Sequence, residues 1–161
     1  MVPIRNVPGG CAGAAIPDKF ERFRLTQVLF NSIDNHMQKE VKKVLAVVND
    51  LFFSVKITDA AKRAGLALEF VKDGTELMEK AKHRPALIIL DLNFEPVEPI
   101  QTIVKLKGSP ETKGINLIGY LSHVQVELKV QAQDAGCDMV LARSAFSQSM
   151  PQIFKRYTGM L

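Results

Sequence analysis

The chain has 161 residues, of which 47% are hydrophobic and 24% are charged. This length and composition predict one compact domain and exclude a disordered chain. The 21 basic and 17 acidic residues leave a formal net charge of +4, which is a weaker basic bias than nucleic-acid-binding proteins show. No apolar run approaches the roughly 20 residues that a membrane-spanning helix needs. We therefore expect neither a nucleic acid nor a membrane as partner.

The first 36 residues differ in composition from the rest. Residues 1–16 contain two prolines and three glycines without periodicity, a pattern that predicts a loop or disorder. We expect residues 1–36 to be an N-terminal extension, either disordered or upstream of a true start at Met37, and residues 37–161 to form the folded domain. The alternative is an arm that docks on the domain or on a partner.

The cysteine content concerns the cellular compartment. Cys11 and Cys137 are the two cysteines of the chain, too few for a scaffold held by disulfide bonds. Because disulfide-poor proteins are typical of reducing compartments, we expect a cytoplasmic location.

From Met37 onward, short apolar runs alternate with segments of helical spacing. Apolar runs without polar alternation are typical of strands buried on both faces of a parallel sheet. There are five such runs, at residues 44–48, 67–71, 86–90, 115–121 and 139–142. Five helices are predicted from apolar stripes: Phe53, Ile57, Ala61 and Ala64; Leu77, Met78 and Ala81; Ile100, Ile103, Val104 and Lys107; Val124, Leu128, Ala132 and Ala135; and Ile153, Phe154 and Tyr157.

Two residues mark helix ends in this pattern. Gly136 is expected to follow the fourth helix in the left-handed conformation that glycine adopts easily. Pro151 is expected in the first turn of the fifth helix, because proline disrupts a helix interior. Five strands alternating with five helices predict a doubly wound α/β domain.

Polar and charged residues follow the apolar runs. In an open parallel sheet the functional crevice lies beyond the carboxyl ends of the strands. Two carboxylates that meet there repel each other, and they need a divalent cation such as Mg²⁺, a basic side chain or a proton. The residues at these ends are Asn49 and Asp50 after the first run, Asp91 and Asn93 after the third, Ser122 and His123 after the fourth, and Arg143 and Ser144 after the fifth.

This constellation resembles the receiver (CheY-like) domain of two-component response regulators over about the whole of residues 41–161. The similarity is carried by five motifs in order: Val-Val-Asn-Asp ending at Asp50, Asp73-Gly74, Leu-Asp-Leu-Asn around Asp91, Ala135-Gly136, and a cation after the fifth strand. The resemblance implies a flavodoxin-like fold with a five-stranded parallel sheet, strand order 2-1-3-4-5, and five helices.

The resemblance also implies site residues. Asp91 takes the position of the phosphoacceptor, Asp50 that of a direct Mg²⁺ ligand together with Asp91, and Asn93 contributes its carbonyl as the third protein ligand. Ser122 falls one residue out of register near the hydroxyl position, and with Arg143 it would bind the acyl phosphate. Such a domain is not an enzyme beyond Mg²⁺-dependent autophosphorylation from a phosphodonor.

Several positions depart from the family pattern. Asn49 replaces an acidic residue, Arg143 replaces the usual lysine, Ser144 a common proline and Val140 the aromatic switch residue; residues 93–99 lack the Asp-Gly turn. An ion pair between Arg143 and Asp91 would make the domain a degenerate pseudo-receiver. Asp50 and Ser122 also have a structural alternative, because both residue types cap helices.

Two functions therefore remain open. The first is a stand-alone receiver of a phosphorelay, phosphorylated on Asp91 by a histidine kinase or another signalling protein. The second is a binding module without phosphorylation, acting through the fourth helix, fifth strand and fifth helix, which is also the expected face of a possible homodimer. Since no effector domain follows within the 161 residues, we expect the domain to transmit its signal through a partner protein or a dimer. A third hypothesis is that the chain is an unrelated enzyme acting on a small molecule, and only the fold supports it.

Overall fold

The computed structural model describes residues 41–122 and 125–158 of the chain. The segment Val41–Leu161 forms one compact unit. The predictions for residues 1–36, for a start at Met37 and for His123 and Val124 lie outside the described residues. None of the helices within these two ranges is long and apolar enough to cross a membrane.

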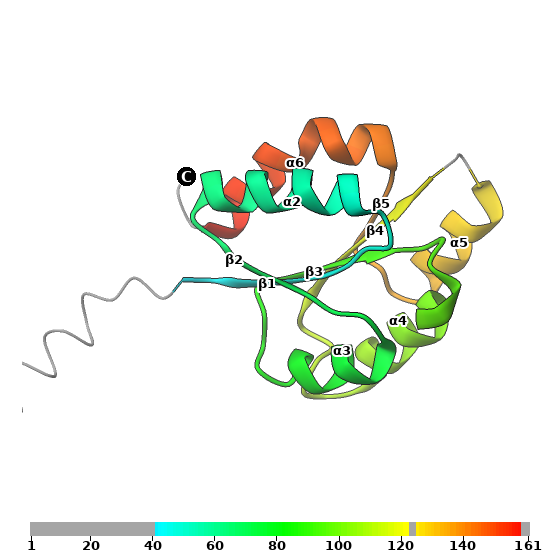
Figure 1. Cartoon of the computed structure of the whole chain (residues 1–161). Coiled ribbons are helices and arrows are strands. Elements are labelled where there is room, and N and C mark those ends of the chain that lie inside the picture. Colours follow the sequence, from blue (N-terminus) through cyan, green and yellow to red (C-terminus); the bar gives the residue numbers. More distant parts are fainter. Residues whose placement is uncertain (1–40, 123–124, 159–161) are drawn as a thin grey trace, which may run out of the picture. The chain divides into compact units, whose positions relative to one another are not determined.

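Strands and α-helices alternate along the described chain (Figure 1). The strands are β1 (Lys43–Val47), β2 (Ala67–Phe70), β3 (Leu87–Asp91), β4 (Asn116–Leu121) and β5 (Met139–Ala142). The helices are α2 (Leu51–Ala64), α3 (Gly74–Ala81), α4 (Pro99–Gly108), α5 (Val126–Asp134) and α6 (Arg143–Thr158), with a 3₁₀ turn, η1 (Glu95–Val97), before α4. The five apolar runs are therefore confirmed as strands.

The sheet is parallel throughout and has the order β2-β1-β3-β4-β5. This is the expected doubly wound topology, with β3 at its centre. Every residue of β3 is buried, including Asp91 at its carboxyl end. The register places Asp91 directly opposite Tyr120 of β4, a pairing that becomes important at the site.

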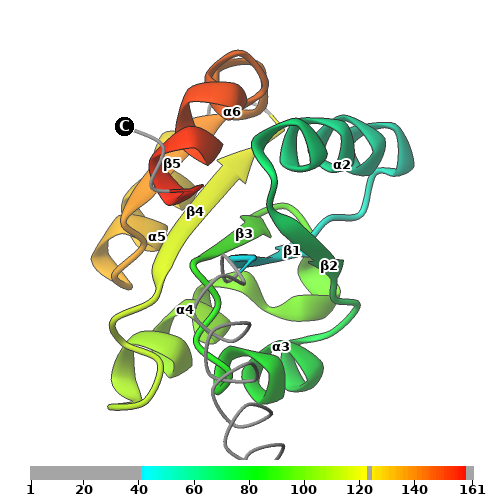
Figure 2. The ribbon, with the colours of Figure 1, turned by 90° about the vertical axis from the view of Figure 1, so that its left-hand side faces the viewer.

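Helices cover both faces of the sheet. Figure 1 shows α2 and α6 side by side on one face, and α3, α4 and α5 on the other; Figure 2 shows the same layers turned by 90°. Because successive side chains of a strand point to opposite faces, β1 contributes Val44 and Ala46 to the core under α2 and α6. Leu45 and Val47 enter the core on the other face.

Local sequence signals account for the helix ends. Asp50 is the N-cap of α2. Gly65, with φ +73°, is the C-cap of the same helix. Asp73 accepts a hydrogen bond from the Glu76 N–H (2.8 Å) at the start of α3. Gly136 has φ +104° after α5, which confirms the left-handed position predicted for it.

Two helix predictions were wrong in detail. Val104 is 54% exposed, and α4 instead buries Thr102, Ile103 and Leu106. Helix α6 begins at Arg143, directly after β5, so that Pro151 lies inside the helix. The buried side chains Phe146, Met150 and Ile153 continue the helical spacing across the proline, and their burial offsets the hydrogen bond that proline removes.

Gly119 of β4 generates a stability prediction. A Cβ atom at this position would lie 2.9 Å from Cδ1 of Leu92, whose side chain is buried. We expect Gly119→Ala to reduce the free energy of unfolding by about 1–3 kcal/mol, because overpacking forces neighbours from their preferred positions. Urea denaturation measures the change. Gly114→Ala is the control, since nothing lies within 4 Å of its Cβ position; equal stability of the two variants would contradict the prediction.

Candidate functional site

The site lies at the carboxyl edge of the sheet, where α2 and α6 also begin. Asp91 is the last residue of β3, Ser122 follows β4, and Arg143 follows β5 as the first residue of α6. Asp50 precedes α2, three residues after the end of β1. The fold thus brings the sequence-predicted residues to one edge, where they form two hydrogen-bonded groups.

The first group is centred on Asp50. Its Oδ1 accepts a hydrogen bond from the Phe53 N–H (2.9 Å), which is the capping bond of α2. Its Oδ2 accepts a hydrogen bond from Nη2 of Arg143 (2.5 Å), and the two side chains form an ion pair. The hydrogen bond from Arg143 and the capping N–H hold the pKa of Asp50 below its ordinary value of 3.8. Both carboxylate oxygens of Asp50 therefore have a donor.

Arg143 pairs with Asp50 and not, as the sequence suggested, with Asp91. The reason is the packing of the helices: α2 and α6 lie side by side on one face (Figure 2), and both begin at this edge. The first residue of α6 consequently lies beside the cap of α2. The guanidinium carbon also lies 4.4 Å from the ring centroid of Phe53, a distance suited to a cation–π interaction.

The second group is centred on Asp91, which is only 6% exposed. Its Oδ1 accepts a hydrogen bond from the Asn93 N–H (3.0 Å), and its Oδ2 accepts one from the hydroxyl of Tyr120 (3.0 Å). Burial, together with the negative charge of Asp91, raises the pKa of Tyr120 far above its usual value near 10. The phenol therefore stays protonated at neutral pH and remains a donor to the carboxylate.

Tyr120 is the site residue that the sequence analysis missed. It lies within an apolar run that was assigned to the core, and it is indeed fully buried. The signal that could have identified it is a polar hydroxyl inside an apolar run, two residues before Ser122. The ring stacks on Phe146 (centroids 5.6 Å apart, 3° between planes) and contacts Phe53 (4.9 Å). Phe53 thereby connects the two groups, since it also contacts Arg143.

Asn93 joins two loops at the edge of the site. Its Oδ1 accepts a hydrogen bond from the Ser122 N–H (2.7 Å), and its Nδ2 donates one to Oε1 of Gln125 (2.8 Å). Gln125, the residue just before α5, is a further participant that the sequence did not suggest. These bonds fix the connection after β3 to the connection after β4.

The donor set fits Mg²⁺ poorly. Mg²⁺ is bound through carboxylate and other oxygens. Here each oxygen of Asp50 and Asp91 already accepts a hydrogen bond, and one donor to Asp50 is the guanidinium of Arg143, whose positive charge opposes a cation. Asn49, next to Asp50, contributes no negative charge. Among the described residues, no group of three or more His, Cys, Asp or Glu side chains is arranged to hold a metal ion.

Known proteins were compared with the chain. No protein-family model and no curated protein sequence matches it. Solved structures do match. A putative response regulator from Chloroflexus aurantiacus J-10-fl has 18% identity and a TM-score of 0.66, over 74% of this chain and 98% of the other. A response regulator from Hahella chejuensis has 20% identity and a TM-score of 0.65, over 72% and 94%.

A third match is the receiver domain of a sensor histidine kinase from Pseudomonas aeruginosa PAO1, with magnesium coordinated in its active-site cleft. It has 16% identity and a TM-score of 0.64, and the alignment covers 73% of this chain and 98% of that domain. The fold of the described residues is therefore that of response-regulator receiver domains, and at these identities the similarity establishes the fold alone.

The ion pair generates a prediction on pH. Arg143→Met removes the main cause of the lowered pKa of Asp50, so we expect that pKa to rise toward 3.8 in metal-free buffer. Because the folded pKa lies below the unfolded one, the stability from this pair is complete above about pH 4 and is lost as the pH falls through the folded pKa. A ¹³C NMR titration of the Asp50 carboxyl measures the change.

Arg63→Met is the matched control, since Arg63 pairs with the exposed Asp59 on the same helix. This variant should leave the titration of Asp50 unchanged. An Asp50 midpoint that is the same in wild type and Arg143→Met would contradict the ion pair.

Proposed function

We propose that the chain is a receiver-fold signalling module that works through protein contacts and without a phosphorylation cycle, as a pseudo-receiver. The observation that carries the proposal is the ion pair between Arg143 and Asp50. It places a guanidinium at the acidic edge where a receiver would bind a divalent cation.

Charge balance supports the proposal. Catalysis of phosphoryl transfer by a metal requires the ion to neutralise charge between the carboxylates and the incoming phosphoryl group. Here Asn49 removes one acid and Arg143 neutralises a second, Asp50. A cation that entered the site would have to displace the guanidinium and would then lie beside it, which is electrostatically unfavourable.

The surroundings of Asp91 support it as well. Tyr120 donates to Oδ2 and the Asn93 N–H to Oδ1, which lowers the nucleophilicity of both oxygens, and Asp91 is only 6% exposed, which narrows the approach path of a phosphodonor. The ring of Tyr120 is fully buried between Phe53 and Phe146, so moving it requires disturbing the core. Asn93 also joins the loop after β3 to Ser122 and Gln125, and these bonds restrict the movement that a phosphorylation switch needs.

Exposed apolar residues indicate where contacts are made. Val126 and Val130, one turn apart on α5, are 68% and 48% exposed. We propose the α5–β5–α6 face, which includes this helix, as the surface for a partner or a homodimer. Apolar patches on a monomer surface mark interaction sites. The partner would be a histidine kinase or another signalling protein in the cytoplasm.

A phosphoacceptor is the second candidate, with Asp91, Ser122 and Arg143 at the reacting group and Asp50, Asp91 and Asn93 around Mg²⁺. The observation in its favour is the place of Asp91 at the end of β3 in a fold shared with the phosphorylated cyanobacterial phytochrome response regulator (22% identity, TM-score 0.61, over 71% of this chain and 89% of that one). It requires Arg143 to leave Asp50 and Tyr120 to release Asp91.

The experiment incubates the protein with Mg²⁺ and acetyl phosphate and measures the intact mass. We expect no added phosphoryl group on the wild type, because Asp50 and Asp91 are both engaged. The comparison variant, Asn49→Asp/Arg143→Lys/Tyr120→Phe, restores the acid, replaces the guanidinium with a more compact ammonium group and removes the phenol donor from Asp91. We expect Mg²⁺-dependent labelling to appear in it. Labelling of the wild type that Asp91→Asn abolishes would overturn the proposal and establish the phosphoacceptor.

A further inference from the structure

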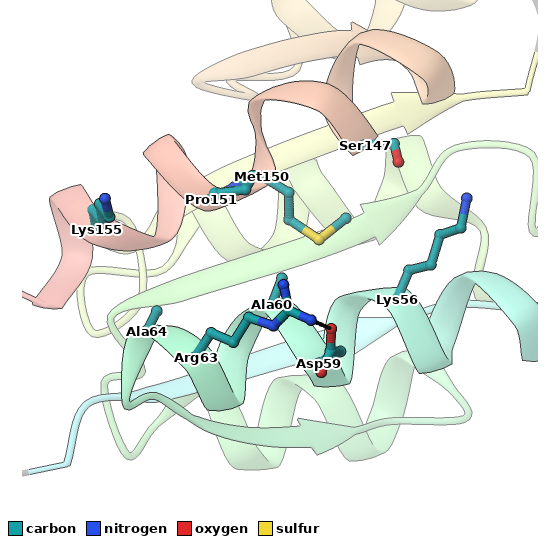
Figure 3. Close-up of a pocket in the computed structure, with 9 residues that line it drawn as sticks. All are labelled: Lys56, Asp59, Ala60, Arg63, Ala64, Ser147, Met150, Pro151 and Lys155. Carbon is teal, nitrogen blue, oxygen red and sulfur yellow. Dashed lines mark ion pairs between the residues drawn. The ribbon is translucent and has the colours of Figure 1, made fainter.

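A groove runs between α2 and α6 on the face that these helices cover (Figure 3). It has a volume of about 540 Å³ and is lined only by residues of these two helices. It starts at Lys56, in the second turn of α2, and includes none of the residues of the Asp50 and Asp91 groups. The groove is therefore a feature separate from the site described above.

The groove has basic side chains on both walls. Lys56 and Arg63 line it from α2, and Lys155 lines it from α6; all three are exposed. The acid that lines it, Asp59, pairs with Arg63 (2.8 Å). In Figure 3 Lys56 and Lys155 lie near opposite ends of the groove, and no dashed line joins either of them to another of the nine residues drawn. Two cations are thus available to an anionic ligand.

The excess of basic over acidic side chains extends to the whole of both helices. Helices α2 and α6 carry one acidic residue, Asp59, against six basic ones, which are Lys56, Lys62, Arg63, Arg143, Lys155 and Arg156. Helices α3, α4 and α5, on the other face, carry four acidic and four basic residues. Among the helices, the net positive charge is therefore carried by α2 and α6.

Between the basic walls the groove is apolar. Met150 lies between the two helices and is 2% exposed, and the side chains of Ala60, Ala64 and Pro151 complete the lining. Methionine adapts its shape to different apolar ligands. The groove therefore offers an apolar floor between cations.

We propose that this groove binds an acidic segment of a partner protein that carries an apolar side chain between its carboxylates. The apolar side chain packs over Met150 and Pro151, and the flanking carboxylates pair with Lys56 and Lys155. Charge complementarity of this kind selects the partner and accelerates its association. The proposal concerns a surface outside the Asp91 group, so it holds whether or not Asp91 is phosphorylated.

A peptide fits the groove better than a nucleic acid does. Single-stranded nucleic acids bind to aromatic side chains on which their bases stack, and the lining of the groove contains no aromatic residue. Alanine, methionine and proline side chains instead match an aliphatic or aromatic side chain of a peptide. The carboxylate of Asp59 at the wall is a further disadvantage for a continuous phosphate backbone.

The experiment selects a displayed library of random linear peptides against the full chain and measures the affinity of the enriched peptides by fluorescence anisotropy. We expect enrichment of Asp and Glu around an apolar residue. Lys56→Glu/Lys155→Glu should weaken binding by about tenfold or more, because it replaces attraction by repulsion at both ends. Lys82→Glu/Lys105→Glu is the matched control, with the same change of net charge on exposed positions of the other face.

A second measurement, by NMR, shows where on the protein the peptide binds. In protein labelled with ¹³C-methyl methionine, we expect the Met150 signal to shift on titration, while Met78, which packs in the core on the other face, stays unchanged. The same titration with a mixed-sequence single-stranded oligonucleotide tests the alternative.

Three outcomes would overturn the proposal. They are the absence of acidic peptides after selection, an affinity equally affected by both charge-reversal variants, and a Met150 signal that responds to the oligonucleotide but to no selected peptide. None of these measurements involves Mg²⁺ or a phosphodonor. A failure here is therefore distinguishable from a failure of the proposed function.

Discussion

The site depends on one constraint of the parallel sheet. All of its strands end at the same edge, so the polar residues that follow them lie close together there. At this edge the chain carries Asp50 and Asp91 close to the buried core, and buried or clustered carboxylates are costly unless a partner neutralises or hydrogen-bonds them. The structure meets this need with its own groups. Arg143 neutralises Asp50, and Tyr120 and the Asn93 N–H satisfy Asp91. The position of Arg143 at the start of α6, beside the cap of α2, is what makes the first of these pairings possible.

An aromatic cluster connects the charged groups to the hydrophobic core. Phe53 lies under the guanidinium of Arg143 and against Tyr120, and Tyr120 stacks on Phe146 of α6. Movement of either charged group would therefore disturb side chains that hold α2 and α6 on the sheet. This arrangement favours a site with one stable configuration, which is the property expected of a module that presents fixed surfaces to its partners. The groove between α2 and α6 and the α5–β5–α6 face are two such surfaces.

The sequence predicted the fold well because the physical signals were strong. Continuous apolar runs identified all five strands, and Gly136 marked the end of α5 because glycine adopts a positive φ easily. Pro151 was misleading, since burial of Phe146, Met150 and Ile153 outweighs the local preference of proline. The sequence predicted most of the residues that lie at the site, but it did not predict which of them pair with each other. The partner of Arg143 depends on how two helices pack, and the role of Tyr120 depends on the register of β3 and β4; neither is encoded in local spacing.

The claim that Arg143 is the resident cation of the site is tested most directly by titrating ¹⁵N-labelled protein with MgCl₂ and following its amide signals. The account predicts that the amides of Asp50, Asp91 and Asn93 do not respond to millimolar Mg²⁺ in the wild type. In Arg143→Gln, which frees Asp50, the same amides should shift in a saturable manner. A saturable response of these amides in the wild type would contradict the account, because it would show that Mg²⁺ binds while the guanidinium is present.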